Sequence, residues 1–376
     1  MKVVFVSPVP GGTGTSGLAM RARFTLESLS RRHEVQLVSP RSTSIGSRVR
    51  RWTHDSLPKF YNACFSIPSD WEEPGSSSCR SASLEMMAHQ PELIHVFRFY
   101  KAPFVTALLG KVSCQLDLDE SEANTRRRLA DLARLNGDAL RASMWESEAK
   151  FFAQAEGKLL PAFERIFVSS DCERGLLLEM HPRLQAEVLP NVVDIPASSR
   201  MDRRRGPFTF LFLGGLGYYP NEDGVRYFIR DILPILVART AGDFRVVVAG
   251  GGASTDLKHL MANSPFVEST GYVPNLEALY QTADVALIPL RAGGGTRIKV
   301  LEAFAHQVPV VSTRMGVEGL PVTNGAEVLI GDGAEEFAHA CVRLMESSEL
   351  GSDIARSAYE LVRTRFSSQV LDATLR

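Results

Sequence analysis

The amino-terminal stretch MKVVFVSPVPGGTGTSGLAMRARFTLESLSRRHEVQLV (residues 1–38) decides the fold class. A short apolar run, Lys2–Ser7, leads into a glycine-rich loop, an amphipathic stretch over 18–30 and a second apolar run, Glu34–Val38. Strand, loop, helix and strand in this order are typical of the beginning of a parallel α/β sheet. Further strands of this sheet are expected, with helices between them, at 93–96, 114–118, 165–168 and 186–189.

A polar segment with prolines, residues 194–207, separates this part of the chain from a second set of apolar runs. Continuous runs of Val, Ile, Leu and Phe indicate strands that are buried on both faces of a sheet. We therefore predict two α/β domains, 1–194 and 195–350, and a helical segment, 351–376, that crosses back to the first domain. The strands expected in the second domain are 208–213, 244–249, 285–289, 308–312 and 328–330.

The composition excludes several classes of protein. The 376 residues include 42 Lys and Arg against 43 Asp and Glu, a balance that is atypical of nucleic-acid binders. No stretch approaches the roughly 18 consecutive apolar residues of a membrane span. The five cysteines are widely spaced and lack a Cys-x-x-Cys pair, which argues against a disulfide framework and a zinc site. We expect a cytoplasmic protein that needs neither a metal nor another cofactor.

A triple-glycine loop is the candidate binding site of the second domain. The apolar run 283–289 is followed by three glycines, 293–295, and by a helix that is expected to begin near Thr296. Glycines let backbone amides approach a ligand, and a helix amino terminus carries a partial positive charge. Arg297 and Lys299 are unfavourable for the helix dipole in this first turn. They therefore indicate that an anion such as a diphosphate binds between them.

Glu302 extends the same candidate site. It lies one helical turn beyond Lys299 on nearly the same face, where its carboxylate can accept hydrogen bonds from a ribose. The alternative is that Arg297 and Lys299 are exposed surface cations and that Glu302 only pairs with Lys299.

These segments resemble the donor-site signature of the family 4 (group 1) glycosyltransferases, and the similarity is dense from about 165 to 345. Members of this family use nucleotide-sugar donors and have the GT-B fold, in which two Rossmann-like parallel-sheet domains face a central cleft. The resemblance implies that the first domain binds the acceptor and the second binds the donor. The matching segments are Ala283–Val285 with Pro289, Glu302–Ala305, Pro309–Thr313, Leu189–Asp194, Phe212–Gly215, Gly271–Pro274 and Gly316–Leu320.

The donor site departs from the family pattern at one glutamate. Glu302 resembles the second glutamate of the family's Glu-x7-Glu motif, which binds the ribose. The first glutamate would fall on position 294, which is Gly294 here. We therefore expect the backbone amides of Gly294, Gly295 and Thr296 to bind the donor sugar.

A second departure concerns the diphosphate. Many family members hold it with an arginine and a lysine directly after the first strand of the second domain, whereas residues 214–223 contain no cation here. Arg297 and Lys299 are expected to take over this role.

Further donor contacts are expected in both domains. The glycine-rich loop of the first domain is not a P-loop, because no Gly-Lys-Ser/Thr follows it. The resemblance implies that its Gly12 and Gly14 contact the diphosphate and the acceptor. The remaining donor-site candidates of the second domain are Gly215, Tyr218, Asn221, Tyr272 and Val273. For Tyr218 and Asn221, the alternative is a role in a turn or in packing.

Four acids lie within six residues, Asp117 to Glu122, at the end of the predicted strand 114–118. In many relatives this strand ends in a His-Asp pair beneath the donor sugar, and Asp119-Glu120 stands in its place. The cluster indicates metal ligation or recognition of hydroxyl or amino groups, and helix capping is the alternative. Asp119 is the candidate catalytic residue because it is nearer the strand end. His95 is expected to be a structural residue.

The resemblance implies a hexosyltransferase-like, metal-independent enzyme that retains the anomeric configuration. Arg297, Lys299 and the helix amino terminus would stabilise the leaving diphosphate. The acceptor would be a glycan, a lipid-linked sugar or a small molecule, in polysaccharide, glycolipid or natural-product glycoside biosynthesis. Peripheral membrane contact through two arginine clusters, 48–51 and 203–205, is possible.

Other functions remain open. With Asp119 as general base the transfer would invert the anomeric configuration. The departures from the family pattern also fit a nucleotide-sugar-binding regulatory partner of a transferase that has no turnover of its own. A third possibility is another enzyme of the same fold, such as a nucleotide-sugar epimerase.

Overall fold

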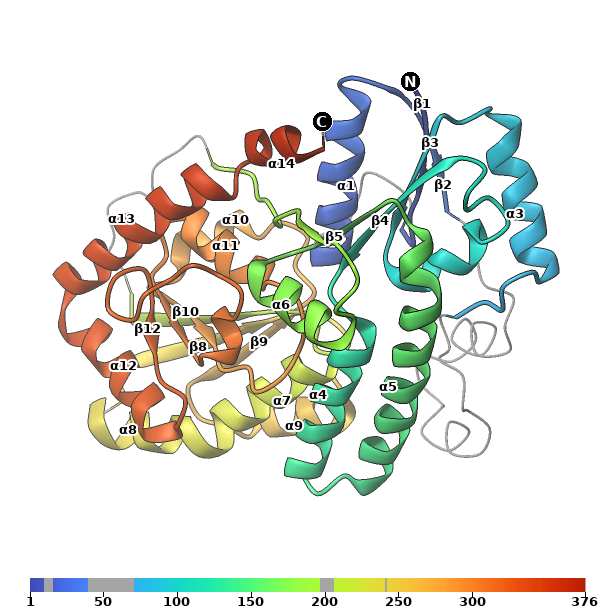
Figure 1. Ribbon diagram of the computed structural model, residues 1–376. Coiled ribbons are helices and arrows are strands. Elements are labelled where there is room, and N and C mark those ends of the chain that lie inside the picture. Colours follow the sequence, from blue (N-terminus) through green and yellow to red (C-terminus); the bar gives the residue numbers. More distant parts are fainter. Residues whose placement is uncertain (10–15, 40–70, 197–205, 241, 376) are drawn as a thin grey trace. The chain divides into compact units, whose positions relative to one another are not determined.

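The computed structural model describes residues 1–9, 16–39, 71–196, 206–240 and 242–375, and this part of the chain divides into two compact units (Figure 1). The first unit comprises Met1–Gly14, Leu18–Pro190 and Leu371–Arg376. The second comprises Thr15–Gly17 and Asn191–Val370, so the units meet in sequence at 190/191, close to the expected 194/195. Of the expected carboxy-terminal helical segment, residues 351–370 belong to the second unit and the remainder to the first.

The first unit contains a parallel sheet in which the described strands have the order β2-β1-β3-β4-β5-β6. Its six strands confirm the predicted ones: β1 (Lys2–Val6), β2 (Glu34–Val38), β3 (Leu93–Phe97), β4 (Ser113–Asp119), β5 (Arg165–Val168) and β6 (Glu187–Val188). The described α-helices are α1 (Gly17–Ser30), α3 (Ser77–Ala88), α4 (Glu122–Leu135), α5 (Ala139–Leu159) and α6 (Asp171–Met180). Helix α14 (Ser368–Thr374) begins in the second unit and ends in the first.

Side-chain alternation along β1 explains why this sheet is covered on both faces. Val4 and Val6 pack into a core with Phe152 of α5. Val3 and Phe5 point to the opposite face, where they pack with residues of α1. A parallel strand with two buried faces reads as an unbroken apolar run, which is why the sequence predicted it.

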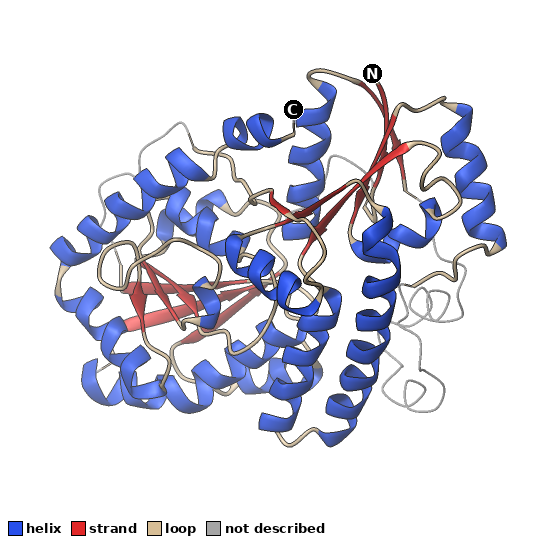
Figure 2. Ribbon diagram, in the orientation of Figure 1, coloured by secondary structure: helices blue, strands red, loops and turns tan. Residues whose placement is uncertain are grey.

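The second unit contains a parallel sheet whose described strands have the order β12-β11-β10-β7-β8-β9, and helices lie on both sides of it (Figure 2). Its strands are β7 (Phe208–Leu213), β8 (Phe244–Ala249), β9 (Val267–Gly271), β10 (Val285–Ile288), β11 (Val310–Ser312) and β12 (Leu329–Ile330). Its described helices include α7 (Tyr219–Tyr227), α8 (Leu233–Thr240), α9 (Thr255–Ala262), α10 (Glu277–Thr282), α11 (Ile298–Ala305), α12 (Ala334–Glu346) and α13 (Ser348–Arg365).

Strand β9 was not predicted from the sequence. Its residues, VESTG, are polar and largely exposed, because β9 forms the edge of the sheet. An edge strand that is not covered on both faces lacks the apolar run by which the other strands were found. The other five strands of this unit confirm the predicted runs.

The strand order fixes where this unit can bind a ligand. Strand β7 pairs with β8 on one side and with β10 on the other. From β7 the chain first adds strands on the β8 side and later on the β10 side, so the strand order reverses at β7. In open parallel sheets, ligands bind at such a switch point, beyond the carboxyl ends of the strands. The β7–α7 and β10–α11 loops extend from this point, and both are the glycine-rich segments chosen from the sequence.

The glycines at this edge allow the backbones to approach closely. A Cβ atom on Gly250, just after β8, would lie 1.8 Å from the backbone oxygen of Gly214, just after β7. Any side chain at Gly250 would therefore displace the β7–α7 loop.

Candidate donor-binding site

Arg297 is folded into the triple-glycine loop. Helix α11 begins at Ile298, two residues later than expected, and Arg297 is the residue that precedes its first turn. The guanidinium donates hydrogen bonds to the backbone oxygens of Gly294 (2.5 Å) and Gly295, and to that of Met315 (3.3 Å). Arg297 is only 8% exposed, so it is not a surface cation. Its charge is held inside the loop, which it ties to the segment after β11.

The side chain of Lys299 extends from α11 to the end of β7, where its ammonium group lies. Its Nζ donates a hydrogen bond to Asn221 Oδ1 (2.7 Å), and Asn221 Nδ2 donates to the backbone oxygen of Gly215 (3.0 Å). A Cβ atom on Gly214 would lie 2.6 Å from the ammonium. The β7–α7 loop contains no cation of its own, and Lys299 supplies one from a helix 78 residues away in sequence.

Lys299 and Glu302 have strongly shifted pKa values. Burial and, to a smaller extent, the nearby Arg297 lower the pKa of Lys299 to about 7, against the opposing effect of Glu302. Burial raises the pKa of Glu302 to about 7 against the opposing effects of Lys299 and a hydrogen bond from Tyr280. An anion bound beside Lys299 would favour the charged ammonium and raise its pKa again.

This shift predicts a pH dependence for anion binding. Between about pH 7.5 and 9 we expect the affinity for a nucleoside diphosphate to fall by up to about tenfold per pH unit, because Lys299 loses its proton as the pH rises through its pKa. Isothermal titration calorimetry at stepped pH measures this decrease. In Lys299→Arg the guanidinium stays protonated, so its affinity should be nearly constant. Equal slopes in the two proteins would rule out Lys299 as the titrating group.

An arginine that the sequence analysis did not single out anchors the start of the same loop. Arg291 Nε and Nη2 bind the two carboxylate oxygens of Asp223 on α7 at 3.0 and 2.6 Å. Its guanidinium also lies 4.7 Å from the ring centroid of Tyr227. In the sequence, Arg291 is a single arginine two residues after the predicted strand 285–289. Its acidic partner, Asp223, is known only from the fold.

The other candidate residues of the second unit lie on the loops at this sheet edge. Tyr218 precedes α7, and Tyr272 and Val273 follow β9; the two tyrosines are well exposed, Tyr272 at 66%. Thr296 is buried, and its hydroxyl accepts a hydrogen bond from Asn191 Nδ2 (2.7 Å). Gly12 and Gly14 lie outside the described residues.

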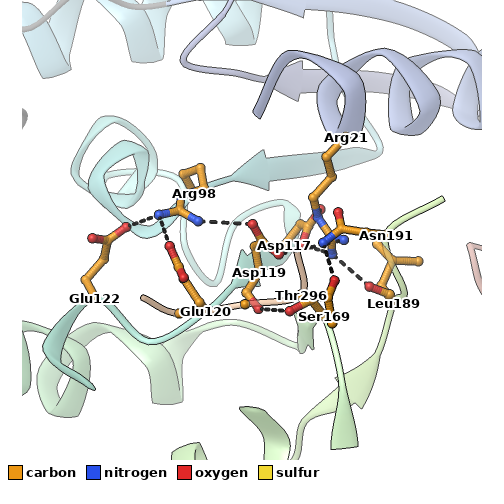
Figure 3. Close-up of polar contacts among 12 residues, drawn as sticks. Arg21, Arg98, Asp117, Asp119, Glu120, Glu122, Ser169, Leu189, Asn191 and Thr296 are labelled. Carbon is orange, nitrogen blue, oxygen red and sulfur yellow. Dashed lines mark hydrogen bonds and ion pairs between the residues drawn. The ribbon is translucent and has the colours of Figure 1, made fainter. Parts of the chain in front are cut away.

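In the first unit, Asp117 belongs to a buried ion pair. Arg21 on α1 binds the two Asp117 carboxylate oxygens at 2.9 and 2.7 Å, and it also donates to the backbone oxygen of Leu189 (2.9 Å; Figure 3). Both side chains are almost completely buried. Desolvation raises the pKa of Asp117, and the facing guanidinium opposes this. Asp117 therefore has a structural partner inside the unit.

The other three acids of the cluster meet Arg98, which follows β3. Its guanidinium pairs with Asp119 (3.1 Å), Glu120 (2.9 Å) and Glu122 (2.6 Å), as Figure 3 shows. Among the described residues there is no group of His, Cys, Asp or Glu arranged to hold a metal ion, and these four acids pair with Arg21 and Arg98. None of the four acids is the amino-terminal cap of α4: the cap is Ser121, whose hydroxyl accepts a hydrogen bond from the Asn124 amide.

Backbone strain distinguishes Asp119 from its neighbours. Asp119 and Arg98 have φ values of +66° and +72°, which are uncommon for residues other than glycine. The Asp119 carbonyl accepts hydrogen bonds from the amide (2.8 Å) and the hydroxyl (2.9 Å) of Ser169, and these bonds hold the strained residue. Such strain concentrates at functional sites, which supports Asp119 as a candidate. The partners Arg21 and Arg98 were missed, because only the fold brings them to the acids.

His95 lies in the core of the first unit, which agrees with the expected structural role. It is completely buried in β3, 5.5 Å from Phe5 and 6.1 Å from Phe167 between ring centroids. Burial, with smaller contributions from Arg21 and Arg165, lowers its pKa to about 3. The imidazole is therefore neutral at physiological pH.

Comparison with known proteins decides the family of the second unit. Residues 207–347 match the family model "Glycosyl transferases group 1". The chain carries a group 1 glycosyltransferase domain. This domain holds the switch point of the second sheet and the Arg297, Lys299 and Glu302 side chains.

Solved structures extend the likeness beyond the group 1 glycosyltransferase domain to the whole chain. Sucrose-phosphate synthase from Thermosynechococcus elongatus superposes with a TM-score of 0.72 at 14% identity, covering 100% of this chain and 97% of that one. A trehalose-6-phosphate protein from E. coli, bound with UDP-2-fluoro glucose, gives 0.67 at 12% identity, covering 100% and 98%. The fold is therefore GT-B, as expected. That a cleft lies between its domains stays a prediction.

One curated relative is similar to part of the chain. An uncharacterized 44.6 kDa protein in the cps region of Klebsiella pneumoniae is 24% identical over 166 residues. The match covers 42% of this chain and 42% of that relative, less than half of either protein. In the part of the chain that the structure describes, every helix is too short or too polar to span a bilayer.

Proposed function

We propose that the protein is a family 4 glycosyltransferase that moves a sugar from a nucleotide diphosphate sugar to an acceptor, with the donor on the second unit and the acceptor on the first. The observation that carries this proposal is the position of the Lys299 ammonium. It lies beside Gly214 at the carboxyl end of β7, next to the β7–α7 loop and the triple-glycine loop. A cation placed at the switch point of a parallel sheet suits a diphosphate.

The catalytic role of these cations follows from the charge that develops during transfer. As the bond between the anomeric carbon and the diphosphate breaks, the acceptor oxygen bonds to that carbon and the electron pair remains on the leaving phosphate. Lys299 would pair with this charge directly, and Arg297 would stabilise it from inside the loop. With two protein cations at this position, we propose that transfer needs no metal ion or other cofactor.

The remaining donor contacts divide by chemistry. The Glu302 carboxylate would accept hydrogen bonds from the ribose, and Asn221 would orient Lys299. The loop amides of Gly215, Gly294, Gly295 and Thr296 would bind phosphate or sugar oxygens. Exposed Tyr218 and Tyr272, with Val273, offer faces for the base or the sugar. Contacts from Gly12 and Gly14 stay a prediction.

Retention is the stereochemical outcome that we propose. The acceptor attacks from the face of the leaving group, and its hydroxyl proton passes to the departing phosphate oxygen. Asp119 would then orient the donor sugar or the acceptor by hydrogen bonding to hydroxyl groups. Inversion with Asp119 as general base is the alternative, and it is favoured by the strained position of this residue at the end of β4.

Two measurements test this function together. A panel of UDP, GDP and ADP sugars, assayed for release of the nucleoside diphosphate with glycan and lipid-linked acceptors, should give turnover with one base. Absence of release despite tight nucleotide binding would favour a regulatory binding partner without turnover. NMR of the product should then show the anomeric configuration of the donor, and the opposite configuration would overturn retention.

We propose that the protein acts in polysaccharide biosynthesis and not in natural-product glycosylation. This proposal rests on the similarity to the relative from the cps region. The acceptor is then a glycan or a lipid-linked sugar. The two arginine clusters that could contact a membrane, 48–51 and 203–205, lie outside the described residues. The expected cytoplasmic location also stays a prediction.

A further inference from the structure

Tyr280, on α10, is buried against the two α11 residues that carry the proposed donor site. Only 1% of its surface is exposed. Its hydroxyl donates a hydrogen bond to the backbone oxygen of Lys299 (3.4 Å) and also has a side-chain hydrogen bond to the Glu302 carboxylate one turn further along α11. This polar contact reaches the only acidic side chain of α11.

The ring of Tyr280 is fixed by a second contact with α11. It stacks on the imidazole of His306 with a centroid separation of 4.5 Å and an interplanar angle of 12°. His306 directly follows α11, and its backbone amide donates to the Glu302 carbonyl. Because the ring rests on the end of the same helix, the phenol oxygen is held at a constant place relative to Glu302.

This arrangement restricts a side chain that is otherwise free to rotate. A glutamate has three side-chain torsions, and ordering them costs conformational entropy whenever a ligand binds. One hydrogen bond from a fixed donor orders these torsions in advance and leaves lone pairs on the carboxylate for a ligand. Burial and the neighbouring Glu302 raise the pKa of Tyr280 well above its ordinary value, so the hydroxyl remains a donor throughout the working pH range.

We infer that Tyr280 is a positioning residue, which orients the Glu302 carboxylate to accept hydrogen bonds from the ribose hydroxyls of a nucleoside diphosphate. The inference rests on the proposed function, in which Glu302 binds the ribose. It adds that discrimination between ribose and deoxyribose depends on a residue that does not touch the nucleotide.

The test compares Tyr280→Phe, which keeps the stacked ring and removes the hydroxyl, with the wild type. Calorimetry with UDP, GDP and ADP selects the nucleotide that binds most tightly, and its 2′-deoxy and 3′-deoxy forms are then titrated. We expect the wild type to prefer the ribonucleotide by about tenfold or more, as a hydrogen bond to a charged group requires. In Tyr280→Phe this preference should fall below about threefold, while binding of the deoxy forms stays within about twofold.

Three further variants separate the possible outcomes. Tyr227→Phe removes a hydroxyl that lies 3.5 Å from the Asp332 carbonyl, away from Glu302, and should leave the preference unchanged. Glu302→Gln should lower the ribose preference as Tyr280→Phe does. His306→Leu removes the stacking partner but keeps the hydroxyl, and should lower the preference about threefold; it serves as the second probe if Tyr280→Phe lowers the melting temperature strongly.

The results distinguish failure of the inference from failure of the proposed function. An unchanged preference in Tyr280→Phe and His306→Leu, with a loss in Glu302→Gln, overturns the role of Tyr280 and leaves that of Glu302 intact. If Glu302→Gln does not change the preference for ribose, the roles of both Glu302 and Tyr280 are overturned. Absence of binding of all three nucleotides by the wild type overturns the proposed function itself.

Discussion

Replacing Lys299 with methionine should reduce turnover of the nucleotide sugar by about 10²–10³-fold. Methionine matches the length of the lysine side chain but cannot pair with the leaving diphosphate, and loss of one well-placed donor to a developing charge has this magnitude. The variant should remain folded, because burial already lowers the Lys299 pKa to about 7 and its removal relieves that desolvation cost. Release of nucleoside diphosphate at saturating donor measures the first effect, and thermal melting measures the second.

Lys258→Met is the matched control for this prediction. Lys258 is an exposed residue of α9 in the same unit, so its replacement should leave turnover within about twofold. Near-native turnover in Lys299→Met would show that the ammonium beside Gly214 does not act on the leaving group. Loss of turnover together with a large drop in melting temperature would assign Lys299 a structural role.

Replacing Asp117 with asparagine should destabilise the first unit by about 3–5 kcal/mol. The substitution removes the nearer counter-charge of the buried Arg21 guanidinium and leaves only Asp119, at 3.9 Å; breaking one side of a buried ion pair has this cost. Two of the three tryptophans, Trp71 and Trp145, lie in the described part of the first unit, and the second unit contains none, so tryptophan fluorescence follows the unfolding of the first unit in denaturant.

The first unit also contains the control for this substitution. Asp171 pairs with Arg174 at 2.7 Å, the same distance as between Arg21 Nη2 and Asp117, but the Asp171 side chain is 80% exposed. Asp171→Asn should therefore cost less than about 1 kcal/mol. Similar losses in Asp117→Asn and Asp171→Asn would mean that burial does not determine the strength of the Arg21–Asp117 pair.

The strands could be predicted from the sequence because a buried parallel strand is apolar along its whole length. The runs at 208–213 and 244–249 coincide with β7 and β8 for this reason. Edge strand β9 lacks the pattern because its side chains are largely exposed. The start of α11 was placed two residues too early, because Arg297 remains outside the helix and folds back onto the carbonyls of the triple-glycine loop.

The residue types of the donor site could be predicted, but most of their partners could not. Spacing along one helix was enough to associate Lys299 with Glu302. The contact of Lys299 with Asn221 depends on how α11 and α7 meet at the sheet edge, and no local pattern reports this. The contact of Arg98 with Asp119 likewise arises because β3 and β4 end side by side.

The acidic cluster illustrates the same limit within a single segment. Asp117 and Asp119 are two residues apart, and the sequence could only rank them by distance from the strand end. The structure separates them by burial and backbone conformation. Asp117 is neutralised by Arg21, whereas Asp119 has a positive φ at a shift in the pairing of β4 with β5.

A crystal structure of the protein bound to its preferred nucleoside diphosphate examines the proposed donor site directly. We expect the Lys299 ammonium within hydrogen-bonding distance, about 3 Å, of a phosphate oxygen, with Glu302 on the ribose. A nucleotide bound elsewhere, or one whose phosphates leave Lys299 in contact with Asn221 alone, would contradict the claim that this lysine holds the diphosphate.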